Sequence, residues 1–136
     1  MAGNQTPAHP GTNPQPTPSV FPAVGKIFLH LSEAANDGVQ LDLAGSEGFV
    51  LGRSDSKSSY IPDVDLAAFM ALDKGVSRRH AAFVRYEGKL HIVDLSSING
   101  TFLNGSRLSP EVPYPLHPGD RLVLGELTLL LSQVET

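Results

Sequence analysis

From residue 26 onward, the chain is a series of short β-type segments separated by turn residues. Val, Ile, Leu, Phe and Tyr fill the segments, whereas Gly, Asn, Asp and Ser gather between them, as in strands joined by tight turns. Helical periodicity is almost absent, and the one helix candidate is the short stretch at residues 66–72. Many short strands with regular turns are typical of two packed sheets. The sequence therefore predicts an all-β sandwich.

The expected strands follow the apolar or alternating runs of the sequence. They cover residues 26–31, 39–43, 49–51, 62–66, 81–86, 89–95, 101–103, 121–124 and 127–131. Turn signals separate them at residues 36–38 and 45–48 and at the pairs Glu87-Gly88, Asn99-Gly100, Asn104-Gly105 and Gly125-Glu126. The Asn-Gly pairs are strong signals because these residues readily adopt the positive φ angles of tight turns.

Residues 1–25 differ from the rest of the chain, because they contain no Asp, Glu, Lys or Arg and hold six of its 11 prolines. Such a segment buries too little apolar surface to offset the entropy of ordering, and its prolines favour extended conformations. We expect a disordered Pro/Thr-rich tail or linker at residues 1–25, followed by one domain at residues 26–133. A chain of 136 residues has room for one such core.

Charge and composition argue against several classes of function. The net charge of −4 opposes binding to nucleic acid, which requires an excess of Lys and Arg. No apolar run approaches the ~20 residues of a membrane-spanning helix, and the N-terminus lacks the basic start of a signal peptide. We therefore expect a cytoplasmic protein without a membrane partner. The chain has no cysteine and its histidines lack metal-ligand spacing, so we expect neither a metal nor a cofactor.

Three loop segments carry side chains suited to an anion, and each lies at the end of an expected strand. They are Gly52-Arg53, Gly75-Val76-Ser77-Arg78-Arg79-His80 and Ser96-Ser97-Ile98-Asn99-Gly100-Thr101. In a sandwich the loops at one end form the binding surface. Together these segments offer guanidinium groups, hydroxyls, a carboxamide and turn amides, all of which suit the acceptor oxygens of a phosphate.

The same segments, in this order, resemble the forkhead-associated (FHA) domain. The ending Pro118-Gly119-Asp120-Arg121-Leu122-Val123-Leu124-Gly125 is also similar to that family, and the resemblance covers roughly residues 26–133. One motif alone would be a weak signal, but the whole set on predicted strand ends is specific. The resemblance implies an eleven-stranded β-sandwich of the FHA/SMAD type. It also implies apical loops that bind phosphothreonine peptides, without catalysis or a metal.

The resemblance also assigns roles to individual residues. Arg53 and Ser77 would contact the phosphate, with Arg78 as a further donor, and Asn99 would hold the peptide backbone beside the phosphothreonine. Gly52, His80 and Gly100 would shape the loops without touching the ligand. Arg79 neighbours Arg78 just before a strand, so we expect its side chain to diverge to the opposite face and to serve a structural or surface role.

Two departures from the family pattern stand out. Many members place Thr or Ser before the Asn-Gly pair to add a hydroxyl to the phosphate, whereas this chain has Ile98 within its expected binding site. Ser97, one residue earlier, should point the other way in a strand-like backbone. The missing hydrogen bond would cost about 1.5–3 kcal/mol of binding free energy. The stretch between Arg53 and Ser77 is also long, and its apolar residues would cover the sandwich edge or shape peptide selectivity.

Two other functions are kept as alternatives. Ile98 favours a domain that binds proteins without phosphate. Ser77 and His80, with Asp94 on a later strand, would suit a small hydrolase, but a catalytic triad needs Ser bonded to His and His bonded to Asp. The chain has no Gly-x-Ser-x-Gly elbow, so we expect no enzyme.

The expected partner is a phosphothreonine-containing protein or peptide in Ser/Thr-kinase signalling. The tail offers a partner within the chain, because it carries Thr6, Thr12 and Thr17, and two of them precede proline. A flexible uncharged segment is accessible to a kinase, and a phosphate added there would match the loops.

Overall fold

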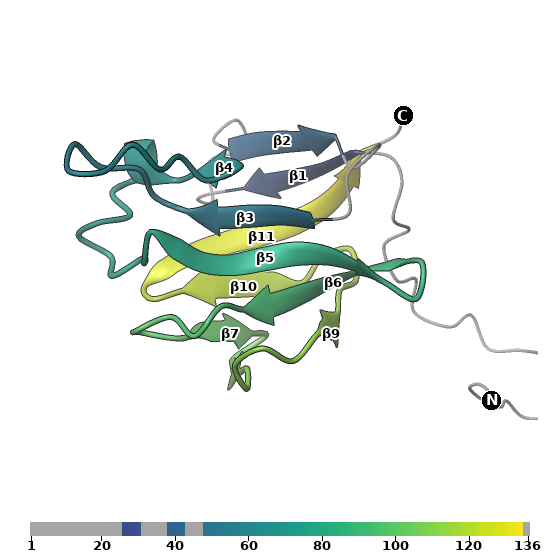
Figure 1. The fold of residues 1–136 in the computed structure, drawn as a ribbon. Helices are drawn as coiled ribbons and strands as arrows, with labels where there is room; N and C mark the ends of the chain where they lie inside the picture. Colours follow the sequence, from purple (N-terminus) through teal and green to yellow (C-terminus); the bar gives the residue numbers. More distant parts are fainter. Residues whose placement is uncertain (1–25, 31–37, 43–47, 135–136) are drawn as a thin grey trace, which may run out of the picture.

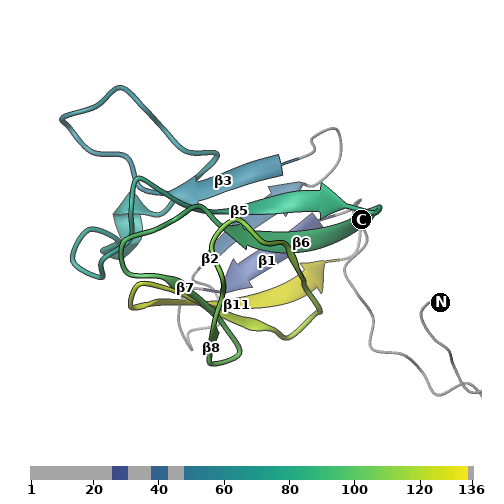
Figure 2. The ribbon, with the colours of Figure 1, turned by 60° about the horizontal axis from the view of Figure 1, so that its bottom comes forward.

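The computed structural model describes residues 26–30, 38–42 and 48–134, and within them eleven strands form two sheets. The six-stranded sheet has the order β2-β1-β11-β10-β7-β8, and the five-stranded sheet has the order β4-β3-β5-β6-β9. The strands are β1 (Lys26–His30), β2 (Gly38–Asp42), β3 (Gly48–Gly52), β4 (Val64–Asp65), β5 (Arg79–Tyr86), β6 (Lys89–Asp94), β7 (Thr101–Leu103), β8 (Ser106–Arg107), β9 (Tyr114–Pro115), β10 (Arg121–Leu124) and β11 (Leu127–Val134). Figure 2 shows β3, β5 and β6 in one layer and β1, β2 and β11 in the other. The fold is the all-β sandwich that the sequence predicts.

A hydrophobic core fills the space between the two sheets. Its largest fully buried side chains are Phe83, Leu29, Leu51, Leu66, Ile92, Leu116, Leu122, Leu124, Leu129 and Leu131. They come from both sheets and from the connections between them, so each sheet buries one apolar face against the other. Burying a side chain of this size contributes roughly 1.5–3 kcal/mol to folding. This core holds the strand ends, and therefore the loops, in fixed positions.

The pairing of β3 with β5 is antiparallel and contains one irregularity. Leu51 pairs with Ala81, whereas the next residue, Gly52, pairs with Arg79, so His80 is the extra residue of a β-bulge. Bulges bend a strand and re-aim a side chain. This bulge lies where β3 ends and β5 begins, next to the residues that the sequence motifs single out.

The described residues contain one short helix, a 3-10 turn named η1 (Ala67–Phe69), within the predicted helical stretch at residues 66–72. Met70 ends it in the left-handed conformation at φ 64°. Leu66 and Ala71 are buried, but Met70 and Leu72 are 61% and 66% exposed, so the segment covers the sandwich edge with only some of its apolar side chains. The described residues include no helix with the length and apolar character that a membrane crossing requires.

Each expected strand has a counterpart in the structure, with boundaries shifted by a few residues. The two-residue strands β8 and β9 are additions that the sequence analysis does not contain. The predicted tail at residues 1–25 and the turns before Gly38 and Gly48 lie outside the described residues. The loops that follow β3, precede β5 and follow β6 lie at one end of the sandwich, opposite the β5–β6 hairpin (Figure 1). We call this the apical end.

Candidate functional site

Three apical loops carry the predicted site residues: the β3–β4 loop (residues 53–63), the β4–β5 loop (residues 66–78) and the β6–β7 loop (residues 95–100). Hydrogen bonds between residues far apart in sequence join them. Arg53 connects the first loop to the second through the Val76 carbonyl, and Asn99 connects the third to the second through the Gly75 carbonyl. The fold therefore brings the three motif segments together.

Arg53 leaves the end of β3, and its backbone and side chain are both held. Its backbone N–H donates to the Arg78 carbonyl at 3.2 Å, across the bulge. Its Nε donates to the Val76 carbonyl at 2.6 Å, and its Nη1 donates to Asp55 Oδ2 at 3.2 Å. These two side-chain bonds use two of the five guanidinium N–H groups. The side chain is 16% exposed, so these bonds hold a largely buried guanidinium group that still reaches solvent.

Arg78 reaches the same carboxylate from the other side. Its Nε donates to Asp55 Oδ2 at 2.8 Å, so one oxygen accepts bonds from both arginines. The Arg78 side chain is 49% exposed. The backbone N–H of Lys57 lowers the pKa of Asp55, as do hydrogen bonds and charge from Arg78 and Arg53, and together these outweigh desolvation. Asp55 is therefore a carboxylate at neutral pH. Arg79, at the start of β5, is exposed.

Ser77 lies between the arginines and the β6–β7 loop. Its backbone N–H donates to His80 Nδ1 at 3.0 Å, and its hydroxyl accepts a long 3.4 Å bond from the backbone N–H of Ile98. The Ile98 side chain is 85% exposed, so an apolar group stands at the tip of this loop. Ser97 points inward as expected: its hydroxyl donates to Asp94 Oδ1 at 2.6 Å and accepts from the Gly100 N–H at 3.0 Å.

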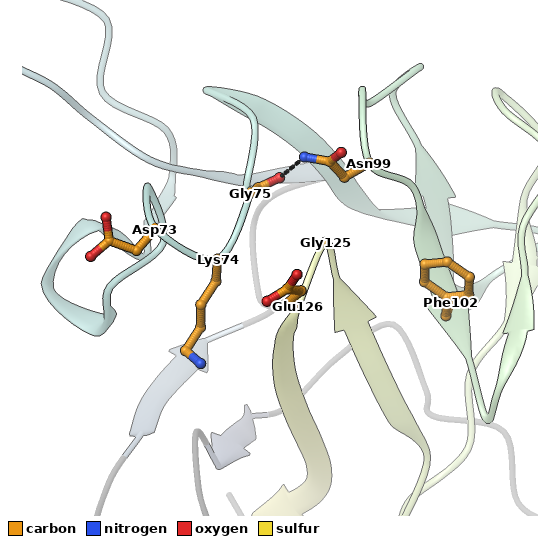
Figure 3. Close-up of a pocket in the computed structure, with 7 residues that line it drawn as sticks. All are labelled: Asp73, Lys74, Gly75, Asn99, Phe102, Gly125 and Glu126. Carbon is orange, nitrogen blue, oxygen red and sulfur yellow. Dashed lines mark hydrogen bonds between the residues drawn. The ribbon is translucent and has the colours of Figure 1, made fainter.

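Asn99 closes the other side of the site. Its Nδ2 donates to the Gly75 carbonyl at 2.9 Å, which aligns its carboxamide beside the β4–β5 loop. Behind it lies an open pocket of about 290 Å³, drawn in Figure 3. Asp73, Lys74, Gly75, Asn99, Phe102, Gly125 and Glu126 line this pocket. The lining combines positive and negative side chains with one aromatic ring, and the β10–β11 turn contributes Gly125 and Glu126.

His80 is fully buried and joins two of the loops. Because its Nδ1 accepts from the Ser77 N–H, its Nε2 carries the proton and donates to the Gly100 carbonyl at 2.8 Å. Burial lowers the pKa of His80, and the bond to Gly100 and the charge of Asp94 only partly offset this. His80 therefore stays neutral and spans the gap between the β4–β5 and β6–β7 loops.

The described contacts of His80 differ from those of a catalytic triad. Its two ring nitrogens bond to the backbone of Ser77 and Gly100, whereas Asp94 accepts bonds from Ser97 and Thr101. A triad requires the serine hydroxyl and the aspartate on the two ring nitrogens. The described residues also contain no group of three or more His, Asp or Glu side chains that could hold a metal.

Gly52, Gly100 and Asp65 fix the backbone of the apical loops. The Gly52 carbonyl accepts from the Leu66 N–H at 2.8 Å, so the β3–β4 connection closes on itself. Gly100 has a φ of 89°, a left-handed conformation that glycine adopts without strain. Asp65 accepts from Ser54 N at 2.9 Å and from Ala67 N at 3.0 Å. Desolvation raises the pKa of Asp65, but the bonds from Ser54 and Ala67 outweigh it and lower the pKa overall.

Sequence reasoning missed Asp55 and Asp65 as parts of the site. Asp65 has a local signal, because an Asp that accepts from the N–H two residues later forms a common turn at the start of a helical segment. Asp55 has no such signal for its contact with Arg78, which lies 23 residues away in sequence. Only the folded structure shows that Asp55 and Arg78 are in contact.

A sequence model of the FHA domain matches residues 49–125. The chain belongs to the FHA domain family. It is 32% identical over 114 residues to the oxoglutarate dehydrogenase inhibitor of Corynebacterium diphtheriae, covering 84% of this chain and 70% of that protein. The domain also superposes on the solution structure of the FHA domain of an Arabidopsis thaliana hypothetical protein with a TM-score of 0.63, at 27% identity, over 93% of this chain and 97% of the other.

A third comparison concerns a structure with a bound peptide. This FHA domain superposes on the N-terminal FHA domain of Rad53p from S. cerevisiae, which was solved in complex with a phosphothreonine peptide. The TM-score is 0.59 and the identity is 20%, over 82% of this chain and 94% of that domain. This likeness shows a shared fold.

Proposed function

We propose that this FHA domain binds phosphothreonine peptides at its apical loops and acts as a cytoplasmic interaction module in Ser/Thr-kinase signalling. One observation carries the proposal: the guanidinium groups of Arg53 and Arg78 converge on a single carboxylate oxygen of Asp55. The chain as a whole is acidic, with a net charge of −4, yet two arginine side chains lie together at this position. An anion of suitable shape is the ligand that such an arrangement recognises.

The neighbouring groups suit the rest of a phosphopeptide. The Ser77 hydroxyl lies between the arginines and the β6–β7 loop and would donate to a phosphate oxygen. The Asn99 carboxamide retains an acceptor oxygen and a second N–H, which would pair with the peptide backbone. The pocket behind Asn99 would then receive a side chain of the peptide. Charge-assisted bonds to phosphate would supply affinity, and the pocket would supply selectivity.

The comparisons support a binding role over an enzymatic one. The relative from C. diphtheriae is named as an inhibitor, and the Rad53p domain holds a phosphothreonine peptide. The described contacts of His80, which bond it to backbone groups, agree with a structural role for this residue.

The test is a calorimetric titration of the full chain with three matched peptides that contain phosphothreonine, phosphoserine or unmodified threonine at one position. We expect the phosphothreonine peptide to bind with micromolar affinity, a binding free energy of about −8 kcal/mol, because few loop contacts are available. The unmodified peptide should not bind measurably. Equal affinity for the phosphorylated and unmodified peptides would contradict the proposal.

A phosphate-independent binding domain is the second candidate, and the exposure of Ile98 favours it. This side chain is 85% exposed at the tip of the β6–β7 loop, where many FHA domains carry a hydroxyl. The same titration separates the two functions, because this candidate requires the unmodified peptide to bind. The Ile98→Thr variant sharpens the result, since an added hydroxyl should tighten phosphopeptide binding by about tenfold.

The N-terminal segment is a further candidate partner. Phosphorylation at Thr6, which precedes a proline, would tether a phosphothreonine at an effective concentration of about millimolar. Some 20 residues separate it from Lys26, a mean span of ~25 Å for a flexible coil. Competition between an external phosphopeptide and a chain carrying phosphothreonine at position 6 tests this, with Thr6→Ala as the control. Equal external affinity in both would reject it.

A further inference from the structure

Asp55 occupies the position at which the two arginines converge. Its Oδ2 accepts from Arg53 Nη1 at 3.2 Å and from Arg78 Nε at 2.8 Å. Its Oδ1 accepts from the Lys57 N–H at 2.9 Å, which fixes the carboxylate plane. A negative group from the domain itself therefore stands where the proposed phosphate would bind.

Phosphate and Asp55 compete for the same donors. A guanidinium group binds carboxylate and phosphate oxygens through the same planar N–H groups. A phosphothreonine carries a charge of about −1.5 to −2 and three strong acceptor oxygens, whereas a carboxylate carries −1 and two oxygens. A peptide carboxylate offers the arginines nothing that Asp55 does not already provide, and Asp55 is tethered at a high effective concentration.

The β3–β4 loop allows the Asp55 side chain to leave without unfolding. The neighbouring Ser54 is anchored separately, because its backbone N–H and hydroxyl both donate to Asp65, at 2.9 Å and 2.5 Å. The described bonds that hold the Asp55 carboxylate itself are those from the two arginines and from Lys57 within its own turn. Its side chain is 20% exposed, so a rotation would bring the carboxylate into solvent. Displacement would leave the loop backbone in place.

We propose that Asp55 is an intramolecular competitor that an incoming phosphate must displace from Arg53 and Arg78. This inference rests on the proposed phosphopeptide function and deepens it. Asp55 lowers the affinity of the site for every anion by a common factor. Only a phosphorylated peptide then binds strongly enough to be detected, and the binding of acidic peptides without phosphate is too weak to measure. Asp55 thus sets the affinity that a ligand must have in order to bind, and it does so by occupying the arginines itself, in contrast to a residue that orients them for the ligand.

The experiment measures the affinity of the full chain for a phosphothreonine peptide and for the same peptide with glutamate at that position. The variants are Asp55→Asn and Asp55→Ser, and the serine hydroxyl retains an acceptor for the Lys57 N–H. Glu87→Gln is the control, because it removes one negative charge from the exposed β5–β6 turn at the opposite end. Thermal unfolding of each variant establishes that it is folded.

We expect both Asp55 variants to bind the phosphothreonine peptide at least roughly fivefold more tightly than the wild type, because the arginines lose a charge-assisted partner. The glutamate peptide should change from undetectable to measurable binding, and Glu87→Gln should bind as the wild type does. Equal or weaker phosphopeptide binding by folded Asp55 variants, while the wild type binds, would overturn this inference alone. Absence of binding by the wild type and all variants would overturn the proposed function and the inference together.

Discussion

At the apical end of the sandwich, side chains tie three loops to one another, whereas at the opposite end a two-residue turn joins β5 to β6. The apical bonds span long sequence distances, as in His80 to Gly100 and Asn99 to Gly75. The opposite turn consists of Glu87 and Gly88, with φ angles of 52° and 76°. Two positive φ angles match the hairpin turn that the twist of paired strands favours.

Because of this difference, we expect changes at the two ends to have different effects on stability and on binding. The β5–β6 turn depends on its own residues, so a change there affects the free energy of unfolding and leaves the binding loops in place. The apical bonds join elements that meet only in the folded chain, so a change there affects both the fold and the placement of the charged groups. Pairs of matched variants, one at each end, allow the changes in unfolding free energy and in peptide affinity to be compared.

The largest expected effect is the loss of phosphopeptide binding in Arg53→Ala. The variant removes the guanidinium group that contacts Val76 and Asp55, and with it two or more charge-assisted bonds to the ligand. Each such bond is worth about 1.5–3 kcal/mol, so affinity should fall by more than roughly 100-fold. Calorimetric titration with the phosphothreonine peptide measures this loss.

The control for Arg53→Ala is Lys89→Ala, which removes an exposed cation beside the opposite turn. It should leave affinity within about twofold of the wild type, because charges separated by more than the ~8 Å screening length interact weakly. Wild-type affinity in Arg53→Ala would show that the phosphate binds elsewhere.

His80→Ala should lower both stability and affinity. The variant leaves the Ser77 N–H and the Gly100 carbonyl without their partner, at a cost of about 1–3 kcal/mol of unfolding free energy. Affinity should fall by roughly tenfold, because Ser77 then lies out of position for one charge-assisted bond. Urea denaturation and peptide titration give the two values.

His91→Ala is the matched variant for the opposite end. His91 Nδ1 donates to the carbonyl of Lys89, two residues away. Its ring packs against the ring of Tyr86, with 5.1 Å between the two ring centroids. It should therefore lose stability and retain affinity. If His80→Ala kept wild-type stability but lost binding, His80 would be a ligand contact and not a structural link.

Gly100→Ala and Gly88→Ala compare two left-handed positions, with φ angles of 89° and 76°. Each substitution should cost about 1 kcal/mol of unfolding free energy from backbone strain alone. A Cβ at Gly88 meets nothing within 4 Å, whereas one at Gly100 comes within 2.8 Å of Arg107 Nε. Gly100→Ala should therefore be the less stable variant in urea denaturation and should also bind peptide more weakly. Equal losses would mean that the flexible Arg107 side chain moves aside.

Local patterns explain why most of the fold is predictable. The turn pair Glu87-Gly88 and the flanking alternating runs predict β5 and β6 because turn and strand preferences act over a few residues. The two-residue strands β8 and β9 have no pattern of their own and exist by pairing with β7 and β6. The helical stretch at residues 66–72 contains only a 3-10 turn, which ends at the left-handed Met70. Leu66 and Ala71 are both buried, and residues five apart do not share one face of an α-helix.

The candidate site is predictable to the level of its loops. Arg53, Ser77, Arg78 and Asn99 belong to motifs that are readable in order along the chain, and the loops that carry them meet in the structure. The contacts among them are not readable, because they depend on the path of the β3–β4 loop. That path places Asp55 between two arginines and makes an acidic residue part of a cationic site.

The smallest expected effect is a dependence of stability on pH that arises from His80. Burial lowers the pKa of His80 in the folded chain below its ordinary value of 6.5, so the unfolded chain takes up the proton first as the pH falls. The stability that neutral His80 contributes is therefore complete above pH ~6.5 and is lost progressively below it. Protonation would also place a hydrogen on Nδ1, opposite the Ser77 N–H, and break that bond. The lowered pKa values of Asp55 and Asp65 act in a separate window below about pH 4, where their carboxylates gain protons.

Urea denaturation without peptide, between pH 7.5 and pH 5.5, measures this dependence free of the phosphate's own titration near pH 6. The wild type should lose stability over this range, and His80→Gln should lose less, because its side chain does not titrate. If His80→Gln showed the wild-type slope, the pH-sensitive contact would lie outside the apical loops. The apical loops would then keep their arrangement in acid, and phosphopeptide binding below pH 6.5 would follow the charge of the phosphate alone.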